Sequence, residues 1–88
     1  MNKPDWFDRT KIKITLDARP LIALGEHPLQ RVMEECATLQ PGEIYEIITP
    51  FSPMPMIEKL TALGYKSHME PESNGLFYTY FCKAQEML

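Results

Sequence analysis

The chain has 88 residues, which is enough for one small domain and too few for two. Its 44% hydrophobic and 24% charged residues are typical of a folded domain and argue against disorder. A net charge of −3 argues against a nucleic-acid partner, which would select a basic face. No apolar run approaches the roughly 20 residues that span a bilayer, and the first residues lack the apolar core of a secretory signal. We therefore expect a cytoplasmic protein without a membrane partner, as a monomer or weak homodimer.

Residues 1–10 are predicted to be an N-terminal arm, followed by a single domain over 11–83 and a C-terminal tail over 84–88. The arm carries no periodic pattern, but Trp6 and Phe7 are large apolar groups within it. We expect them to pack onto the edge of the domain, and the alternative is that they anchor a partner.

The first strand is predicted over residues 11–16, where apolar and polar residues alternate strictly. This period of two would place Ile12, Ile14 and Leu16 on one face of a half-buried strand. The following residues, 17–27, are predicted to form a long loop.

The first helix is predicted over residues 28–39. Pro28 suits the first turn of a helix, where its missing N–H costs nothing. An apolar stripe follows at helical spacing, made of Leu29, Val32, Met33, Cys36 and Leu39. Gln40-Pro41-Gly42 ends the helix, and residues 43–49 are rich in strand formers. Strand, helix and strand form a βαβ unit, which predicts that the first two strands are parallel. Cys36 is expected to be a core thiol rather than a nucleophile.

A second helix is predicted over residues 57–63, after a proline-rich loop over residues 50–56. Ser52 suits the N-cap of this helix, and Pro53 and Pro55 suit its first turn. Met54 and Met56 could suggest a soft-metal ligand pair, but without a nearby Cys or His they are expected to fill gaps in the core.

The last two strands are predicted over residues 65–70, near an edge, and 76–83, in the centre, joined by a turn over 71–75. Asn-Gly is the strongest turn signal. The last strand alternates Phe77 and Phe81 with Tyr78 and Tyr80. Whichever pair faces away from the helices would therefore place aromatic groups near solvent.

The order strand, helix, strand, helix, strand, strand predicts an α+β fold: a two-layer sandwich with both helices on one face of a four-stranded mixed sheet.

The candidate ligand-binding residues are Asp17, Arg19, Glu26 and His27, gathered between the first strand and the first helix. The N-terminus of a helix stabilises an anion through its unpaired N–H groups and the helix dipole. Arg19 could bind an oxyanion in a bidentate manner, with Asp17 holding it in place. His27 could act as a neutral hydrogen-bonding group or a metal ligand, and Glu26 could orient its ring.

Three interpretations of these residues remain open. In the first, Asp17 and Arg19 form a bracing ion pair while His27 caps the helix. In the second, the same residues also bind a ligand or partner, and in the third they perform acid/base catalysis. A metal site would need three or four convergent ligands, and His68 lies on another strand. No motif for nucleotide binding or nucleophilic catalysis is present. We therefore assign no catalytic residue, metal ligand or cofactor and leave enzymatic activity open, with no enzyme as the expectation.

The ordered motifs resemble the TusA/SirA-like sulfur-carrier superfamily. These motifs are Leu16-Asp17-x-Arg19-x-Leu21, a helix that opens with x-Pro28, Gln-Pro-Gly-Glu at 40–43 and a short helix that ends in Leu63-Gly64. More narrowly, Leu16-Asp17-x-Arg19-Pro20-Leu21 followed by Glu26-His27-Pro28 resembles an uncharacterised branch of that superfamily. Members of this branch are often attached to hemerythrin-like or other redox-related domains.

The resemblance implies the same fold, with the last strand antiparallel to the others. It also implies that His27 occupies the place of the cysteine that carries a persulfide in the Cys-Pro-x-Pro motif of the carriers. Here Pro28 is kept, Gln30 replaces the second proline, and the preceding loop is four residues longer. Histidine cannot carry sulfane sulfur, so the persulfide role is absent.

Two functions follow as hypotheses, together with a third possibility. The first is a non-catalytic binding or regulatory module that uses Arg19, Glu26, His27 and the adjoining loop over 50–56 to hold a small anion, a metal or a protein partner. The alternative is a redox or sulfur-relay accessory enzyme with His27 as acid/base or metal ligand. The third is a structural module that dimerises through the exposed face of the sheet.

Overall fold

The computed structural model of the chain describes residues 3–84. A 3-10 turn, η1 (Arg9–Lys11), precedes three helices and four strands. In chain order they are β1 (Ile12–Asp17), α1 (Arg19–Ala23), α2 (Leu29–Cys36), β2 (Ile44–Thr49), α3 (Met54–Ala62), β3 (Tyr65–Pro71) and β4 (Phe77–Lys83). Of the predicted tail over 84–88, Ala84 is buried and the rest lies outside the described residues.

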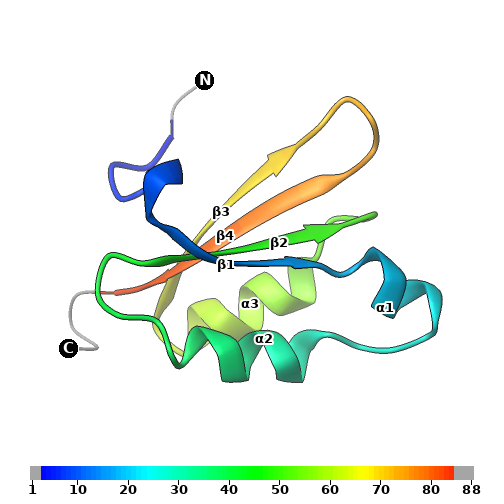
Figure 1. Ribbon diagram of the computed structural model, residues 1–88, viewed down its shortest axis with the longest axis horizontal. Coiled ribbons are helices and arrows are strands. Elements are labelled where there is room, and N and C mark those ends of the chain that lie inside the picture. The colour runs from blue at the N-terminus through cyan, green and yellow to red at the C-terminus, as the bar shows by residue number, and fades with distance from the viewer. Residues whose placement is uncertain (1–2, 85–88) are drawn as a thin grey trace.

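The four strands form one mixed sheet in the order β1-β2-β4-β3. β1 and β2 are parallel, and β4 is antiparallel to both of its neighbours, β2 and β3. α2 and α3 lie on the same face of this sheet (Figure 1). These observations confirm the predicted α+β sandwich, with β4 in its centre and β3 at an edge.

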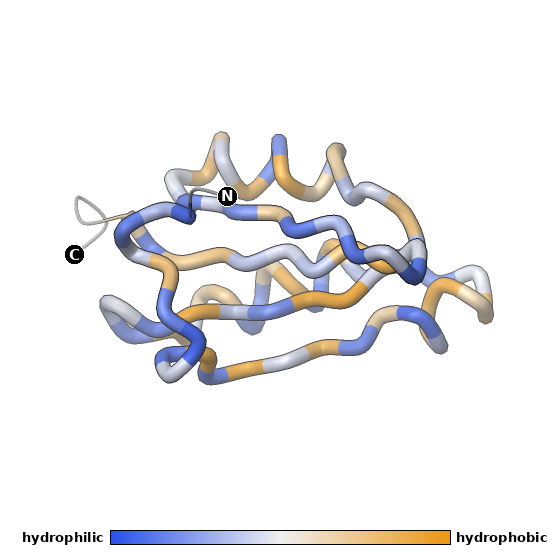
Figure 2. Tube along the Cα trace, turned by 90° about the horizontal axis from the view of Figure 1, so that it is seen from above, coloured by the Kyte–Doolittle hydropathy of each residue, from blue (hydrophilic) through white to orange (hydrophobic). Residues whose placement is uncertain are grey.

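The main core lies between the sheet and the two longer helices. α2 buries Val32 and Cys36, and α3 buries Met56 and Leu60. Residues four apart lie on one side of a helix, so each helix presents one apolar side to the sheet. The strands contribute Leu16, Tyr45, Ile47, Tyr65 and Phe81 to the same cluster. Hydrophobic and hydrophilic residues alternate along helices and strands (Figure 2).

The N-terminal arm crosses the opposite face of the sheet (Figure 1). There, Ile44, Tyr80 and Cys82 form a second buried cluster. Trp6 and Phe7 pack against this cluster, which confirms the prediction that they pack onto the domain. The expectation that aromatic groups on this face lie near solvent is wrong for Tyr80, because the arm covers it and leaves its side chain fully buried.

The start of β1 differs from the strict alternation predicted for it. The pairing of β1 with β2 shifts register between Ile12 and Ile14. A bulge of this kind turns the residues before it toward the other face of the sheet. Ile14 therefore packs with the main core, whereas Ile12 packs with the second cluster under the arm.

The helices also depart from the predicted boundaries. The segment predicted as a long loop contains α1, with Pro20 in its first turn. α3 begins at Met54, within the segment predicted to hold its N-cap and first turn, and its N-cap is Pro53 rather than Ser52. The Ser52 hydroxyl lies 3.5 Å from the Met69 sulfur instead. Pro55 does lie in the first turn, as predicted.

Candidate functional site

A cavity of about 320 Å³ lies where the start of α2 meets the loop between β2 and α3. Its lining comes from α1, the start of α2, the end of β2 and the start of α3: Ile22, His27, Pro28, Leu29, Thr49, Phe51, Pro53, Pro55 and Met56. His27 is the one ionisable side chain among the described residues that line it. We call this cavity the His27 pocket.

The topology of the sheet explains why these segments meet. β1 and β2 are parallel, so their carboxyl ends reach the same edge of the sheet. The segments that lead from these strands into α2 and α3 therefore start side by side. Pro28 is the N-cap of α2 and Pro53 is the N-cap of α3, and neither helix has a side-chain cap. The first N–H groups of both helices are thus left without intrahelical or capping partners near the pocket.

The walls of the His27 pocket are mainly apolar, and part of this apolar surface reaches solvent. The Thr49 hydroxyl donates to the Phe51 carbonyl oxygen at 2.6 Å and fixes the start of the loop. The Phe51 side chain remains 49% exposed, whereas Met56 is buried at the base of α3. The Met54 side chain is also half exposed, so Met54 does not fill the core as predicted, whereas Met56 does. The pocket is suited to an apolar group, with a polar contact at His27.

Asp17 and Arg19 pair with each other at the end of β1. The guanidinium donates from Nε to Oδ1 at 2.9 Å and from Nη2 to Oδ2 at 2.6 Å. These bonds lower the pKa of Asp17 and raise that of Arg19. Leu16 points into the core under the helices, so its neighbour Asp17 points toward the other face. The predicted bracing ion pair is present, but neither member lines the His27 pocket.

Of the predicted site residues, His27 lines the pocket, whereas Asp17, Arg19 and Glu26 do not. The structure brings His27 together with the loop over 50–56, as expected. Glu26 is exposed in the turn before α2, where its N–H donates to the Leu21 carbonyl, and it does not line the pocket. His27 does not cap α2, because Pro28 occupies the N-cap and no side chain caps this helix. Sequence reasoning missed Ile22, which reaches the pocket from the unpredicted α1.

Residues 15–79 match a family described as uncharacterized conserved protein, DUF2249. The chain belongs to the DUF2249 family. This match begins within β1 and ends within β4, so it includes every residue that lines the His27 pocket and leaves out the arm. No curated protein and no solved structure matches the chain significantly.

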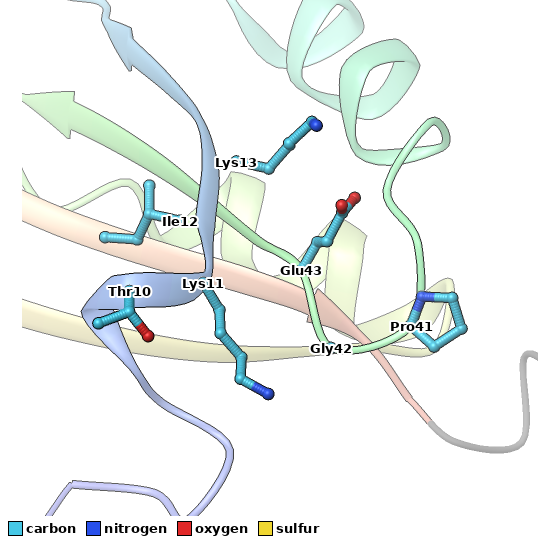
Figure 3. Close-up of a pocket in the computed structure, with 7 residues that line it drawn as sticks. All are labelled: Thr10, Lys11, Ile12, Lys13, Pro41, Gly42 and Glu43. Atoms are coloured by element: carbon cyan, nitrogen blue, oxygen red, sulfur yellow. The ribbon is translucent and has the colours of Figure 1, made fainter.

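A second groove of this DUF2249 chain lies between the start of β1 and the turn before β2 (Figure 3). Its charged lining residues are Lys11, Lys13 and Glu43. The two lysines point away from each other in Figure 3, so they do not converge on one anion. The Glu43 carboxylate accepts a hydrogen bond from the Gln40 N–H at 2.8 Å and thereby closes the turn. The groove therefore lacks the convergent donors of a binding site.

Thiol and metal chemistry have little support in the DUF2249 fold. Cys36 and Cys82 are free and buried. Burial raises the pKa of Cys36 to about 12 and also raises that of Cys82, so both thiols stay protonated at neutral pH. This confirms Cys36 as a core thiol. Within residues 3–84, no three His, Cys, Asp or Glu side chains gather as a metal site would require.

The described residues contain no helix that is both long and apolar enough to cross a membrane.

Proposed function

We propose that this chain is a non-catalytic binding module whose site is the His27 pocket. The observation that carries the proposal is the composition of the lining, in which one exposed imidazole lies at a cavity with mainly apolar walls. Such a site suits a ligand or partner that combines an apolar body with one hydrogen-bonding or anionic group. The unpaired N–H groups at the start of α2 favour a negative charge on that group.

The resemblance to TusA/SirA-like sulfur carriers supports the position of the site. The order of elements and the antiparallel last strand agree with that fold. In the carriers the reactive cysteine precedes the proline at the start of the first long helix, which is where His27 precedes Pro28. We propose that the chain uses the same end of the fold as the carriers, at the start of α2, and binds its partner there without forming a covalent bond.

The surroundings of His27 favour binding over catalysis. A catalytic histidine is normally oriented by a carboxylate or carbonyl and set beside a nucleophile or water. Among the described residues, the His27 ring has no such hydrogen bond, whereas the His68 ring has one to Glu70.

The proposal can be tested by NMR titration of the protein with hexanoate, which has an apolar chain and a carboxylate, and with sulfate, which lacks the chain. We expect hexanoate to shift the amide signals of the non-proline residues in 27–31 and 49–56 more strongly than sulfate does. His27→Ala should weaken the hexanoate response roughly three- to ten-fold, the usual range for one lost hydrogen bond.

Two matched controls are available in the chain. His68→Ala removes a histidine that packs beside Phe7 and Tyr80 on the other face of the sheet, and Arg19→Ala removes the cation of the Asp17 pair. Both should leave the hexanoate response unchanged. A response that is absent, or that is weakened equally by all three substitutions, would contradict the assignment of the site. Catalytic turnover that depends on His27 would favour the accessory-enzyme alternative.

A further inference from the structure

The arm that covers the second face of the sheet is held there by side chains. We call residues 3–11 the strap. The Phe7 ring packs edge-on against Tyr80 with ring centroids 4.5 Å apart, and its centroid lies 5.3 Å from that of His68. Trp6 packs against Phe7 at 6.3 Å and against the same cluster. These aromatic contacts form the apolar part of the attachment.

One carboxylate anchors the polar part of the strap. Glu70 on β3 accepts from Lys3 Nζ at 3.0 Å, Arg9 Nη2 at 3.1 Å and His68 Nε2 at 3.0 Å. The Arg9 Nη1 group also donates to the Tyr80 hydroxyl at 3.2 Å. The Glu70 side chain is 15% exposed, whereas those of Lys3 and Arg9 are about half exposed. Both ends of the strap thus converge on one partly buried charge.

The backbone of the strap is not part of the sheet. Its backbone hydrogen bonds run from the Phe7 N–H to the Pro4 carbonyl at 3.0 Å, from the Lys11 N–H to the Asp8 carbonyl at 2.9 Å and, where the strap meets β1, from the Ile12 N–H to the Arg9 carbonyl. Among the described residues, no backbone hydrogen bond joins residues 3–8 to a strand. The strap can therefore leave the sheet without breaking a strand ladder, which is the condition for local opening at a free energy well below that of global unfolding.

We propose that the strap opens as a unit, with Glu70 as its latch, while the core under the helices stays closed. The open state presents Ile44, Tyr80 and Cys82, which are almost completely buried in the closed state. Cys36 lies in the other cluster, between α2 and the sheet, and stays protected. The device controls access to an aromatic face of the sheet, and it is independent of the His27 pocket.

The two cysteines and the single tryptophan report on this opening directly. Glu70→Gln keeps the size of the side chain and removes its charge, and Glu58→Gln on α3 is a matched control. In Glu70→Gln, a thiol reagent should modify Cys82 roughly ten times faster. We expect this because loss of the ion-pair network should raise the population of the open strap about tenfold. The labelling rate of Cys36 should be unchanged, and the Trp6 emission should shift to longer wavelength.

A second variant removes the latch from the strap and leaves the sheet intact. Lys3→Gln with Arg9→Gln should give the same faster labelling of Cys82 and the same Trp6 shift. If Cys82 and Trp6 respond in neither variant, the latch is refuted. If Cys36 and Cys82 become reactive together, the whole domain opens and the strap is not a separate unit. Neither result bears on hexanoate binding, so this test is distinct from that of the pocket.

Discussion

At the scale of single residues, two side chains have unusual polar surroundings that affect the free energy of unfolding. Thr79 lies fully buried in β4, and its hydroxyl has no hydrogen-bond partner among the described residues. Glu70 lies partly buried but has three positively charged or chargeable partners. The unpaired Thr79 hydroxyl lowers the stability of the fold, and the Glu70 carboxylate makes the attachment of the strap depend on pH.

Thr79→Val should stabilise the protein by about 1 kcal/mol, because it removes the desolvation cost of an unpaired hydroxyl and keeps the shape of the side chain. Chemical denaturation would measure this as a higher midpoint with an unchanged slope. Thr49→Val is the matched comparison. It removes the hydrogen bond from Thr49 to the Phe51 carbonyl and should destabilise the protein. A loss of stability in Thr79→Val would mean that the hydroxyl has a partner in solution.

Glu70 predicts an acid transition of the strap. Burial would raise its pKa, but hydrogen bonds from His68 and Lys3 and the charges of Lys3 and Arg9 outweigh burial and lower it. A lowered folded-state pKa means that the stabilisation is complete above the ordinary carboxyl value near 4.5 and is lost as the pH falls through the lowered value.

Trp6 fluorescence followed from pH 7 to pH 2.5 should therefore show a red shift below about pH 4.5 that Glu70→Gln lacks. Hydrogen bonds from Thr10 also lower the pKa of Asp8 in the strap, so the comparison with Glu70→Gln is what isolates the contribution of Glu70. Burial raises the pKa of Tyr80 to about 12, and Glu46 beside it adds to this effect. An identical pH profile in both proteins would contradict the role of Glu70.

At the scale of elements, side-chain hydrogen bonds join α2 to the sheet in addition to its apolar side, and one of them runs from Lys83 Nζ on β4 to the carbonyl of the C-cap, Ala37, at 3.0 Å. The Tyr45 hydroxyl on β2 donates to Glu35 Oε1 at 2.6 Å, and Glu35 also accepts from Arg31 one turn earlier. Burial and this bond together raise the pKa of Tyr45. Because α2 forms one wall of the His27 pocket, this tie also holds the pocket in shape.

Tyr45→Phe should cost about 1 kcal/mol, the usual value for one hydrogen bond to a group that water can partly solvate again. Urea denaturation would show a lower midpoint, and hexanoate binding should weaken in parallel if α2 shifts. Tyr78→Phe, on the other face, is the control. A midpoint equal to that of the unmodified protein would show that apolar packing alone positions α2.

Sequence patterns predicted those helices and strands in which the spacing of apolar residues reflects burial of one side of the element. The stripe from Leu29 to Leu39 predicted α2, and the strand formers of β2 and β4 predicted the sheet. The bulge at Ile12 could not be predicted, because it is a property of the pairing between β1 and β2 and not of residue type. α1 was missed because five residues are too few to show a helical period.

At the scale of the whole molecule, the sheet separates two regions that the sequence suggested were one. Asp17 points to the face opposite α2 and Arg19 pairs with it, whereas the His27 pocket lies where α2 and α3 begin. The sequence placed these residues in one long loop, whereas α1, which the sequence pattern did not predict, lies between Asp17 and His27. Trp6 and Phe7 were expected to pack onto the edge of the domain. The carboxylate that anchors the arm, Glu70, could not be predicted because it lies more than 60 residues away from Arg9 in sequence.

The β3–β4 hairpin has a consequence for how the chain reaches this structure. Its strands are joined by a turn in which Glu72 N–H donates to the Leu76 carbonyl at 2.8 Å and Gly75 adopts a positive φ of 83°. The β1–β2 pair must close a loop through α1 and α2, and the β2–β4 pair one through α3 and β3. Short loops close at lower entropic cost, so the hairpin should be protected first in pulse-labelled hydrogen exchange. Folding would then proceed from the C-terminal half toward the N-terminus, with the strap docking last.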